Sequence, residues 1–423
     1  MSEERNLIVG FDLCDDYSQI SCFNMKTFEP ESICYEGEED ECLIPTILAV
    51  RKNSYDWYYG KEAIQLVRKE EAIKIDHILK QLREKKEIMI GDTKLDGVSL
   101  LEKFFRKSLS LLKLKYPNQT IDQLVITVEK LEKNIIKSIY KALEGLSIMR
   151  DRVYIQCHQD SFAYYTLYQS KELFMNDVGV FDFSKAGLSY YQLKIDRKKE
   201  KQIVTIAKKD CSDILSYEMI ERQNDMESLN YIFQNVAKNI LYKQVVSTLF
   251  FTGVGFEEQW ADEVMKQLGV GRRIFKGQNL YAKGACYAAR SNKEPDRLKD
   301  YLILTEEMIT SSISILAYYD AKVSEILLAK IATPWYEVKE QFYLVLDDKE
   351  EIELIIKDRN KSDPTVVMMN LDGIANRPKR MTKVYVTVRF LDKYTCVIQV
   401  KDEGFGEFYP STNRIWEKTI NLA

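Results

Sequence analysis

The segment Leu7-Ile8-Val9-Gly10-Phe11-Asp12-Leu13 has a near copy in Val178-Gly179-Val180-Phe181-Asp182-Phe183. In each copy an apolar run ends at an aspartate and leads through a short turn into a second alternating segment. This pattern predicts two related β-hairpins, each presenting one carboxylate where its first strand ends. A chain that repeats such a hairpin is expected to fold into two similar lobes.

The paired aspartates, Asp12 and Asp182, fit two different roles. In two-lobed nucleotide-binding folds, strand-end aspartates face each other across a cleft and hold a hydrated divalent cation, while backbone N–H groups in the turns cradle phosphates. Alternatively, a buried strand ends in Asp because a turn needs a polar residue that caps its own backbone. The duplication favours the first role, since the same residue stands at the same point twice.

The composition is typical of a globular chain with more than one domain. The chain has 423 residues, whereas a single domain has roughly 100 to 200. Its 61 basic and 65 acidic residues leave a net charge of −4, so no whole-chain field favours a nucleic acid or an anionic membrane surface. No apolar run of about 18 residues occurs, and we therefore expect no membrane insertion.

Eight cysteines are scattered along the chain without a C-x-x-C pair. This usage predicts free, mostly buried thiols in a reducing compartment. The charged start MSEERN has no apolar segment of the kind that a secretion signal carries. We therefore expect a cytoplasmic protein. The acidic stretch at 36–41 is predicted to be a solvated loop.

The apolar periodicity divides the chain into an α/β part and an all-β part. From about residue 300, seven short strands separated by turns are predicted, which is typical of a small β-sandwich. The part before residue 300 contains both segments that alternate as strands do and segments with helical spacing. Its predicted elements are strands within 6–50, helices at 61–88 and 98–115, a strand at 124–128, a helix at 130–147 and a strand at 153–156.

The order of these segments resembles that of the DnaK-type heat-shock chaperones, in the actin-like ATPase superfamily, over nearly the whole chain. The resemblance implies an α/β two-lobed actin-like (ribonuclease-H-like) domain at 1–298, a hydrophobic linker at 299–305, and a β-sandwich similar to the chaperone peptide-binding domain at 306–423, without the helical lid. The matching stretches are IVGFDL (8–13), LIPTILAV (43–50), YYGKEA (58–63), VGVFDFSKAGLSYYQLKI (178–195), LFFTGVGFEEQW (249–260), GQNLYAKGACYAA (277–289) and CVIQVKDEGFGE (396–407).

The resemblance also implies where a nucleotide would bind. Asp12 and Asp182 would position magnesium with ATP or ADP, and Lys80 would correspond to the phosphate-contacting lysine. Gly253 and Gly255 would lie in the adenosine loop. From the residues alone, Lys80 equally fits an ordinary lysine on a helix surface, and the two glycines equally fit a turn between strand and helix.

The two phosphate turns depart from the family pattern. The first reads Cys14-Asp15-Asp16 where the family has Gly-Thr-Thr, and the second reads Ser184-Lys185-Ala186-Gly187 where it has Gly-Gly-Gly-Thr. Like charges about 4 Å apart repel by about 4 kcal/mol at an effective dielectric of about 20, so two carboxylates oppose a triphosphate. Lys185 could partly compensate as a cation. These departures predict weak or lost ATPase activity.

Few candidate catalytic groups occur at the junction that follows the strand at 153–156 or among the histidines. The carboxylate that the family has at this junction is replaced by His158 or Gln159, although Asp160 follows directly. A His-based metal site or a Ser-His-Asp triad would need His158 or His77, the only two histidines. Neither is flanked by a nucleophile elbow or a zinc motif. Hydrolase chemistry of that kind is not expected.

We favour a chaperone-like binding or scaffold protein, with no certain cofactor and a protein or peptide as its partner. Binding is predicted in the C-terminal domain through a loop at 316–319, where Tyr318 and Tyr319 combine large apolar area with a hydroxyl group. The alternative is an active ATP-dependent chaperone-like ATPase that couples nucleotide state to peptide binding. A filament subunit or membrane adaptor of the actin superfamily fits less well, because such proteins lack the β-sandwich.

Overall fold

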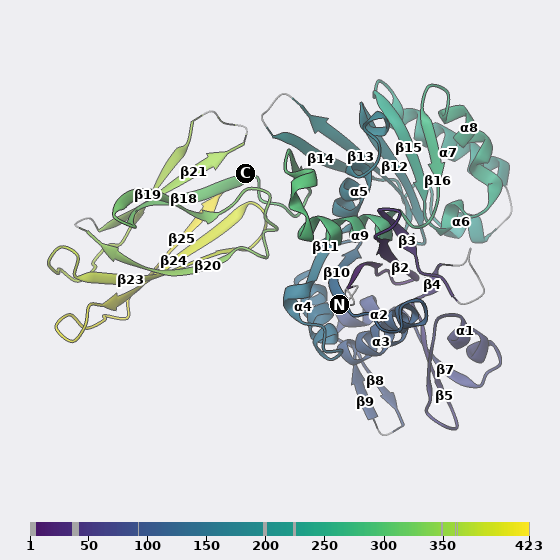
Figure 1. Cartoon of the computed structure of the whole chain (residues 1–423), viewed down its shortest axis with the longest axis horizontal. Helices are drawn as coiled ribbons and strands as arrows, with labels where there is room; N and C mark the ends of the chain where they lie inside the picture. Colours follow the sequence, from purple (N-terminus) through teal and green to yellow (C-terminus); the bar gives the residue numbers. More distant parts are fainter. Residues whose placement is uncertain are drawn as a thin grey trace. The chain divides into compact units, whose positions relative to one another are not determined.

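The two repeated segments form the predicted hairpins. In the first, β1 (Leu7–Asp12) pairs antiparallel with β2 (Tyr17–Asn24), and in the second, β12 (Asp177–Ser184) pairs antiparallel with β13 (Gly187–Asp196). Every residue of β1 is buried, because other elements cover both faces of its sheet. The computed structural model (Figure 1) describes residues 6–35, 42–91, 93–197, 201–222, 226–347, 350–359, 361 and 363–422, without the side chains of 295 and 296.

The sheets built on the two hairpins have the same strand order. β1 lies between β2 and β10 (Ile121–Val128), as β12 lies between β13 and β15 (Val246–Thr252), and β10 and β15 both run parallel to their neighbours. The pairing repeats in detail, because Asp12 lies opposite Thr127 and Asp182 opposite Thr252. The remaining strands are β3 (Glu29–Ser32), β4 (Ile44–Pro45) and β11 (Val153–Cys157) in the first sheet, and β14 (Gln202–Asp210) and β16 (Arg273–Lys276) in the second.

Helices cover these sheets and join them. α9 (Leu280–Lys293) comes late in the chain, yet it packs against β1 and β2 and against α5 (His158–Leu167), and most of its residues are buried. No helix among the described residues is both long enough and apolar enough to cross a membrane. The other helices are α1 (Gly60–Arg68), α2 (Ile78–Glu84), α3 (Gly97–Lys115), α4 (Lys133–Glu144), α6 (Glu218–Glu221), α7 (Met226–Leu241) and α8 (Asp262–Leu268).

The helix predicted at 61–88 is wrong as a continuous element, whereas the one predicted at 98–115 is confirmed as α3. α1 ends at Arg68, and the chain then turns through Glu70, which has a left-handed φ of 59°. A strand follows before α2 begins, because Ala72 and Ile75 are needed to complete a small sheet. The strands of this sheet and of a neighbouring hairpin are β5 (Leu48–Arg51), β6 (Trp57–Tyr59), β7 (Ala72–Ile75), β8 (Glu87–Ile90) and β9 (Thr93–Asp96).

The all-β part contains all seven predicted strands and one more, β25. They form two four-stranded antiparallel sheets, in the orders β19-β18-β21-β22 and β20-β23-β24-β25. Side chains of both sheets, such as Ile313 and Val386, belong to one hydrophobic core. The strands are β18 (Ser311–Tyr319), β19 (Lys322–Ala329), β20 (Lys339–Leu346), β21 (Glu351–Asp358), β22 (Thr365–Asn370), β23 (Thr382–Phe390), β24 (Thr395–Gly404) and β25 (Ile415–Asn421).

The chain divides into two compact units, Met1–Tyr301 and Leu302–Ala423. The segment predicted as a linker at 299–305 contains the short strand β17 (Tyr301–Leu304). The backbone N–H of Gln202 donates to the carbonyl of Asp300, at 2.8 Å. The boundary between the two units therefore falls inside a short strand, directly after Tyr301.

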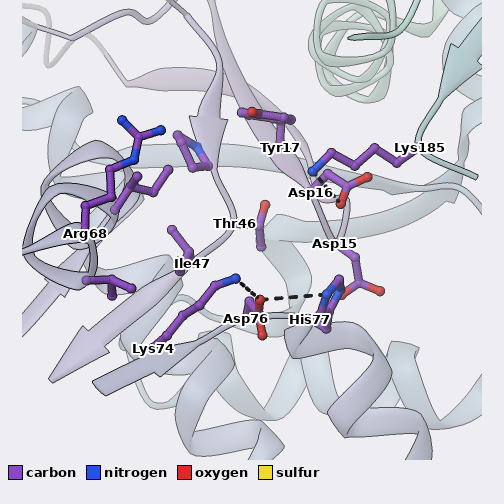
Figure 2. A pocket seen from close by; sticks show the side chains of 13 residues that line it. Asp15, Asp16, Tyr17, Thr46, Ile47, Arg68, Lys74, Asp76, His77 and Lys185 are labelled. Carbon is purple, nitrogen blue, oxygen red and sulfur yellow. Dashed lines mark ion pairs between the residues drawn. The ribbon is translucent and has the colours of Figure 1, made fainter. Parts of the chain in front are cut away.

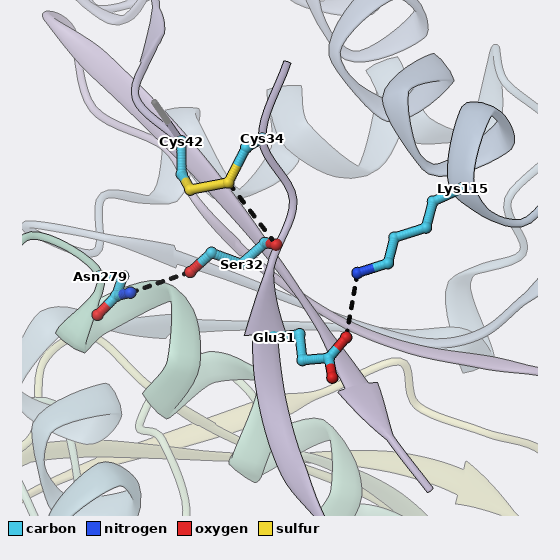
Figure 3. Close-up of a disulfide and its surroundings, with 6 residues drawn as sticks. All are labelled: Glu31, Ser32, Cys34, Cys42, Lys115 and Asn279. Atoms are coloured by element: carbon cyan, nitrogen blue, oxygen red, sulfur yellow. Dashed lines mark hydrogen bonds and ion pairs between the residues drawn. A yellow bond between two sulfur atoms is a disulfide. The ribbon is translucent and has the colours of Figure 1, made fainter. Parts of the chain in front are cut away.

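The prediction that all eight cysteines are free is wrong, because Cys34 and Cys42 form a disulfide (Figure 3). The other six cysteines are free, and all but Cys14 are buried. Beside the disulfide, Asn279 donates to the Ser32 hydroxyl at 3.0 Å. Free thiols were one ground for expecting a cytoplasmic protein, and the disulfide weakens that ground. The acidic stretch at 36–41, inside the loop that the disulfide closes, lies outside the described residues.

Candidate functional site

A buried polar cluster lies where β1 ends. Asp12 is the last residue of β1, Cys14 follows it in the turn, and His158 is the first residue of α5. Nε2 of His158 lies 2.8 Å from Oδ1 of Asp12, and the Cys14 thiol donates to the same oxygen at 3.5 Å. Only 5% of Asp12 and 4% of His158 are exposed. One oxygen of the first strand-end aspartate is therefore already bound by two protein side chains.

The second strand-end aspartate is bound by Tyr281, in the first turn of α9. The tyrosine hydroxyl donates to Oδ2 of Asp182 at 2.8 Å. The tyrosine ring stacks on the imidazole of His158, with the two centroids 3.9 Å apart and the planes 8° apart. Asp12 and Asp182 are thus connected through one stacked pair of rings, which belongs to α5 and α9.

The ionisable groups of this cluster influence one another because they are withdrawn from water. Burial raises the pKa of Asp182 to about 6, the charges of Glu129 and Asp12 add to this rise, and His158 and the Tyr281 hydroxyl oppose it. Burial by itself would lower the pKa of His158, but the charge of Asp12 and the hydrogen bond to it produce a net rise. Burial, followed by the charges of Asp12 and Asp182, raises the pKa of the Cys14 thiol.

The geometry of the cluster does not suit a nucleophilic triad. In such a triad the imidazole contacts the nucleophile through one nitrogen and the acid through the other. Here the same atom, Nε2 of His158, lies 2.8 Å from Asp12 and 3.7 Å from the sulfur of Cys14. The buried Nδ1 has no hydrogen-bond partner among the described residues. All three side chains therefore converge on one point, and the thiol is not activated as a nucleophile.

The carboxylates of the first turn are held by other parts of the chain. Oδ1 of Asp15 accepts the backbone N–H of Leu79 at 2.8 Å, at the start of α2, and Arg83 lies 3.5 Å from the other oxygen. Asp16 lies 3.7 Å from Nζ of Lys185, which belongs to the second hairpin. The predicted compensating cation thus pairs with a carboxylate of the protein.

A pocket of about 370 Å³ opens beside these turns (Figure 2). Asp76 lies in it between Lys74 and His77, at 2.6 and 3.8 Å. Charges of both signs line this pocket, whereas phosphate sites rely on converging backbone N–H groups and cations. Lys80, the predicted phosphate contact, is exposed on α2 and does not line it. The lining residues are Asp15, Asp16, Tyr17, Pro45, Thr46, Ile47, Ile64, Val67, Arg68, Lys74, Asp76, His77 and Lys185.

The glycines predicted in an adenosine loop pack against the end of β12. Gly253 has a φ of 95°, and a Cβ atom there would lie 2.5 Å from the backbone of Phe183. A Cβ atom at Gly255 would lie equally close, 2.5 Å, to the ring of the same phenylalanine. The side chain of Gln278 bonds both backbone groups of Gly253, at 3.0 and 2.9 Å. Close packing therefore accounts for both glycines.

The loop predicted at 316–319 is wrong, because β18 continues to Tyr319. A tight turn through Asp320 and Ala321, both with left-handed φ of 49° and 61°, then leads into β19. Such a two-residue turn matches the twist of paired strands. Tyr318 and Tyr319 are 76% and 68% exposed at this end of the hairpin. Both candidate binding residues are therefore accessible.

Sequence reasoning identified Asp12 and Asp182 as candidates, but it gave no role to His158 and did not foresee the contacts that join these residues. Asp160, the alternative acid at the junction, accepts the backbone N–H of Cys157 at 3.0 Å and caps α5. Tyr281 carried no local signal, because it meets Asp182 across 99 positions of the chain.

Comparisons with known proteins add no established activity. A search among curated proteins finds no match to this chain. Residues 308–422 match a family described as "Domain of unknown function (DUF8552)". Residues 29–306 match one described as "Family of unknown function (DUF5716) C-terminal", and they include His158, Asp182 and Tyr281 but not Asp12 or Cys14. Because this second match covers more than half of the chain, the protein belongs to the DUF5716 C-terminal family.

Proposed function

We propose that this protein is a chaperone-like binding or scaffold protein of the actin-like ATPase type, in which the N-terminal unit has lost effective nucleotide hydrolysis. The observation that carries the proposal is the state of the two strand-end aspartates. Asp12 is bound by His158 and Cys14, and Asp182 by Tyr281. The repeated strand order of the two sheets supports the two-lobed architecture that the proposal assumes.

The energetic argument concerns magnesium. This ion is usually held by one or two carboxylates together with water and substrate phosphates. To reach Oδ1 of Asp12 it would have to displace His158, and breaking a buried ion pair costs about 3–5 kcal/mol. That cost weakens binding by about two to four powers of ten. The carboxylates of Asp15 and Asp16 add repulsion toward a triphosphate.

A melting experiment with magnesium-ATP tests this part of the proposal. A ligand at 100 times its dissociation constant stabilises the folded state by about 2.7 kcal/mol, which raises the melting temperature by several degrees. We expect no such rise with millimolar magnesium-ATP or magnesium-ADP, and no phosphate release above background. A clear rise, together with turnover that Asp12→Asn abolishes, would show that the protein is an ATPase after all.

We further propose that the C-terminal unit carries the binding activity, at the outward face of β18 and β19. Tyr318 lies opposite Val323 in the pairing of these strands, and Leu316 is two residues before Tyr318 on the same face. Leu316, Tyr318 and Val323 are 53%, 76% and 68% exposed. Contiguous exposed apolar side chains are typical of interaction sites. This surface suits an extended peptide with apolar side chains.

Binding of the full chain to a peptide array tests this surface. We expect the double variant Tyr318→Ala/Tyr319→Ala to lose most of the bound signal, because exposed tyrosines contribute large apolar contact area. The matched control is Tyr231→Ala/Tyr242→Ala, which removes two tyrosines of similar exposure, 67% and 68%, from the N-terminal unit. Equal binding by wild type and both folded variants would remove Tyr318 and Tyr319 from the functional account.

A further inference from the structure

We propose that Asp12, Cys14 and His158 form a binding site for a divalent cation of the zinc class. One ligand atom of each residue, Oδ1, Sγ and Nε2, lies within 4.8 Å of the other two. The cluster is the only group of three or more His, Cys, Asp or Glu side chains with this property in the described part of the chain. Carboxylate, thiolate and imidazole are the three side-chain groups that zinc uses as ligands.

The distances between the ligand atoms fit a tetrahedral ion. Zinc bonds of about 2.3 Å to sulfur and about 2.0–2.1 Å to nitrogen and oxygen require ligand atoms about 3.3–3.6 Å apart. The sulfur of Cys14 lies 3.5 Å from Oδ1 of Asp12 and 3.7 Å from Nε2 of His158. The remaining distance, 2.8 Å between Oδ1 and Nε2, would open by about half an ångström as the ion replaces the proton they share.

The surroundings hold the ligands in place. The flat stack of Tyr281 on His158, at 3.9 Å, fixes the plane of the imidazole and therefore the direction of Nε2. Tyr281 is itself fixed by its hydrogen bond to Asp182. These two contacts hold the imidazole in one orientation, while its second nitrogen, Nδ1, has no hydrogen-bond partner among the described residues. Cys14 is only half-buried, so an ion can enter from the side of the turn.

The chemistry of the ligands selects the class of ion. A carboxylate and a thiolate supply two negative charges, which balance a divalent cation, and the neutral imidazole adds none. Sulfur and nitrogen ligands favour zinc and cobalt over magnesium and calcium, which prefer oxygen. Three protein ligands leave one tetrahedral position for water or another group.

Cobalt titration of the tag-free full chain, after removal of metal by a chelator, tests the site. We expect one equivalent of Co²⁺ to produce thiolate-to-cobalt charge-transfer absorption together with the visible bands of a tetrahedral ion, and Zn²⁺ to abolish both. The single variants Cys14→Ser, Asp12→Asn and His158→Gln should each weaken binding by at least about 10–100-fold, since loss of even an outer-shell partner has that effect.

Two control variants separate this site from other cysteines and acids. Cys211→Ser removes a buried thiol elsewhere in the N-terminal unit, and Asp16→Asn removes a carboxylate of the same turn, so both should bind cobalt as wild type does. Alkylation of the wild-type protein gives a readout that needs no variant: at an alkaline pH at which Cys14 of the metal-free protein is labelled, Zn²⁺ should protect this thiol, because the thiolate is the reactive form and the ion occupies it. Absence of the charge-transfer band, its persistence in folded Cys14→Ser protein, or unchanged labelling of Cys14 would each overturn the proposal.

Discussion

Asp182 is a carboxylate whose surroundings oppose its charge at neutral pH. Its pKa is raised to about 6 by burial, whereas an aspartate in an unfolded chain titrates near pH 4. A group with a raised folded pKa binds protons more tightly in the folded state than in the unfolded state. Its contribution to stability is therefore present at low pH and is lost as the pH rises from about 4 to about 6.

Replacing Asp182 with an uncharged residue should prevent this loss of stability at higher pH. We expect Asp182→Asn to be more stable than wild type at pH 8, by at most about 3 kcal/mol for a shift of about two pKa units, and the difference to vanish toward pH 4. The asparagine carbonyl can still accept the hydrogen bond from Tyr281. Denaturant unfolding of wild type and Asp182→Asn across this pH range, in a buffer with chelator, measures how the free energy of unfolding of each protein depends on pH. A difference that stays constant with pH would contradict this account of Asp182.

Among the elements of the C-terminal unit, β24 is tied to two long connections through Asp402. Arg377 donates to both carboxylate oxygens, at 2.7 and 2.8 Å, and the backbone and hydroxyl of Thr412 donate at 2.9 and 2.7 Å. The side chains of Arg377 and Asp402 are 3% and 0% exposed. Burial alone would raise the pKa of Asp402, but these hydrogen bonds hold it well below its usual value.

Removing Arg377 should destabilise the C-terminal unit strongly, because it leaves a buried charge without its partner. We expect Arg377→Gln to cost about 3–5 kcal/mol, measured by calorimetry on the full chain. A carboxylate with a depressed folded pKa contributes stability that is fully present above its unfolded pKa, near pH 4, and is lost as the pH falls below that value. The difference in unfolding free energy between wild type and Arg377→Gln should therefore narrow below about pH 4.

The matched control for Arg377 is a second arginine of the same unit. Arg380 also pairs with an aspartate, Asp347, at 2.8 Å, but the two side chains are 77% and 68% exposed. Exposed ion pairs contribute little because water screens them, so Arg380→Gln should leave the stability close to that of wild type. Similar losses in Arg377→Gln and Arg380→Gln would show that burial of the pair does not decide its contribution.

At the scale of the whole molecule, the chain consists of two units that each contain a core of their own. The core of Leu302–Ala423 is formed by both of its sheets, from Ile313 on β18 to Ile420 on β25. A unit of this size that buries its own apolar faces meets the usual requirement for independent folding. The two families that match the chain also meet near this boundary, at residues 306 and 308.

The C-terminal unit should therefore fold when it is expressed alone as residues 302–423. We expect a cooperative thermal transition, and an amide NMR spectrum whose dispersed peaks coincide with a subset of those of the full chain. Residues 1–301 provide the complementary spectrum as a control. A collapsed spectrum of the C-terminal fragment, with peaks dispersed only in the full chain, would show that the two units form one cooperative structure.

The sequence by itself determined the elements whose signal is local. The hairpins around Asp12 and Asp182, helix α3 and the strands from β18 to β24 follow from alternation or helical spacing, which each segment expresses without its neighbours. Local spacing gave a wrong prediction where pairing with a strand distant in sequence determined the structure of the segment. The helix predicted at 61–88 is interrupted by β7 because β5 offers that segment a sheet to join.

Only the tertiary structure decided what surrounds the two aspartates. His158 reaches Asp12 across 146 positions of the chain, and Tyr281 reaches Asp182 across 99, because α5 and α9 pack together beside β1. The disulfide between Cys34 and Cys42 was equally hidden, since cysteine spacing alone does not show which thiols approach each other. Contacts between distant segments depend on how whole helices and strands pack together. This packing cannot be predicted from residue types and local periodicity.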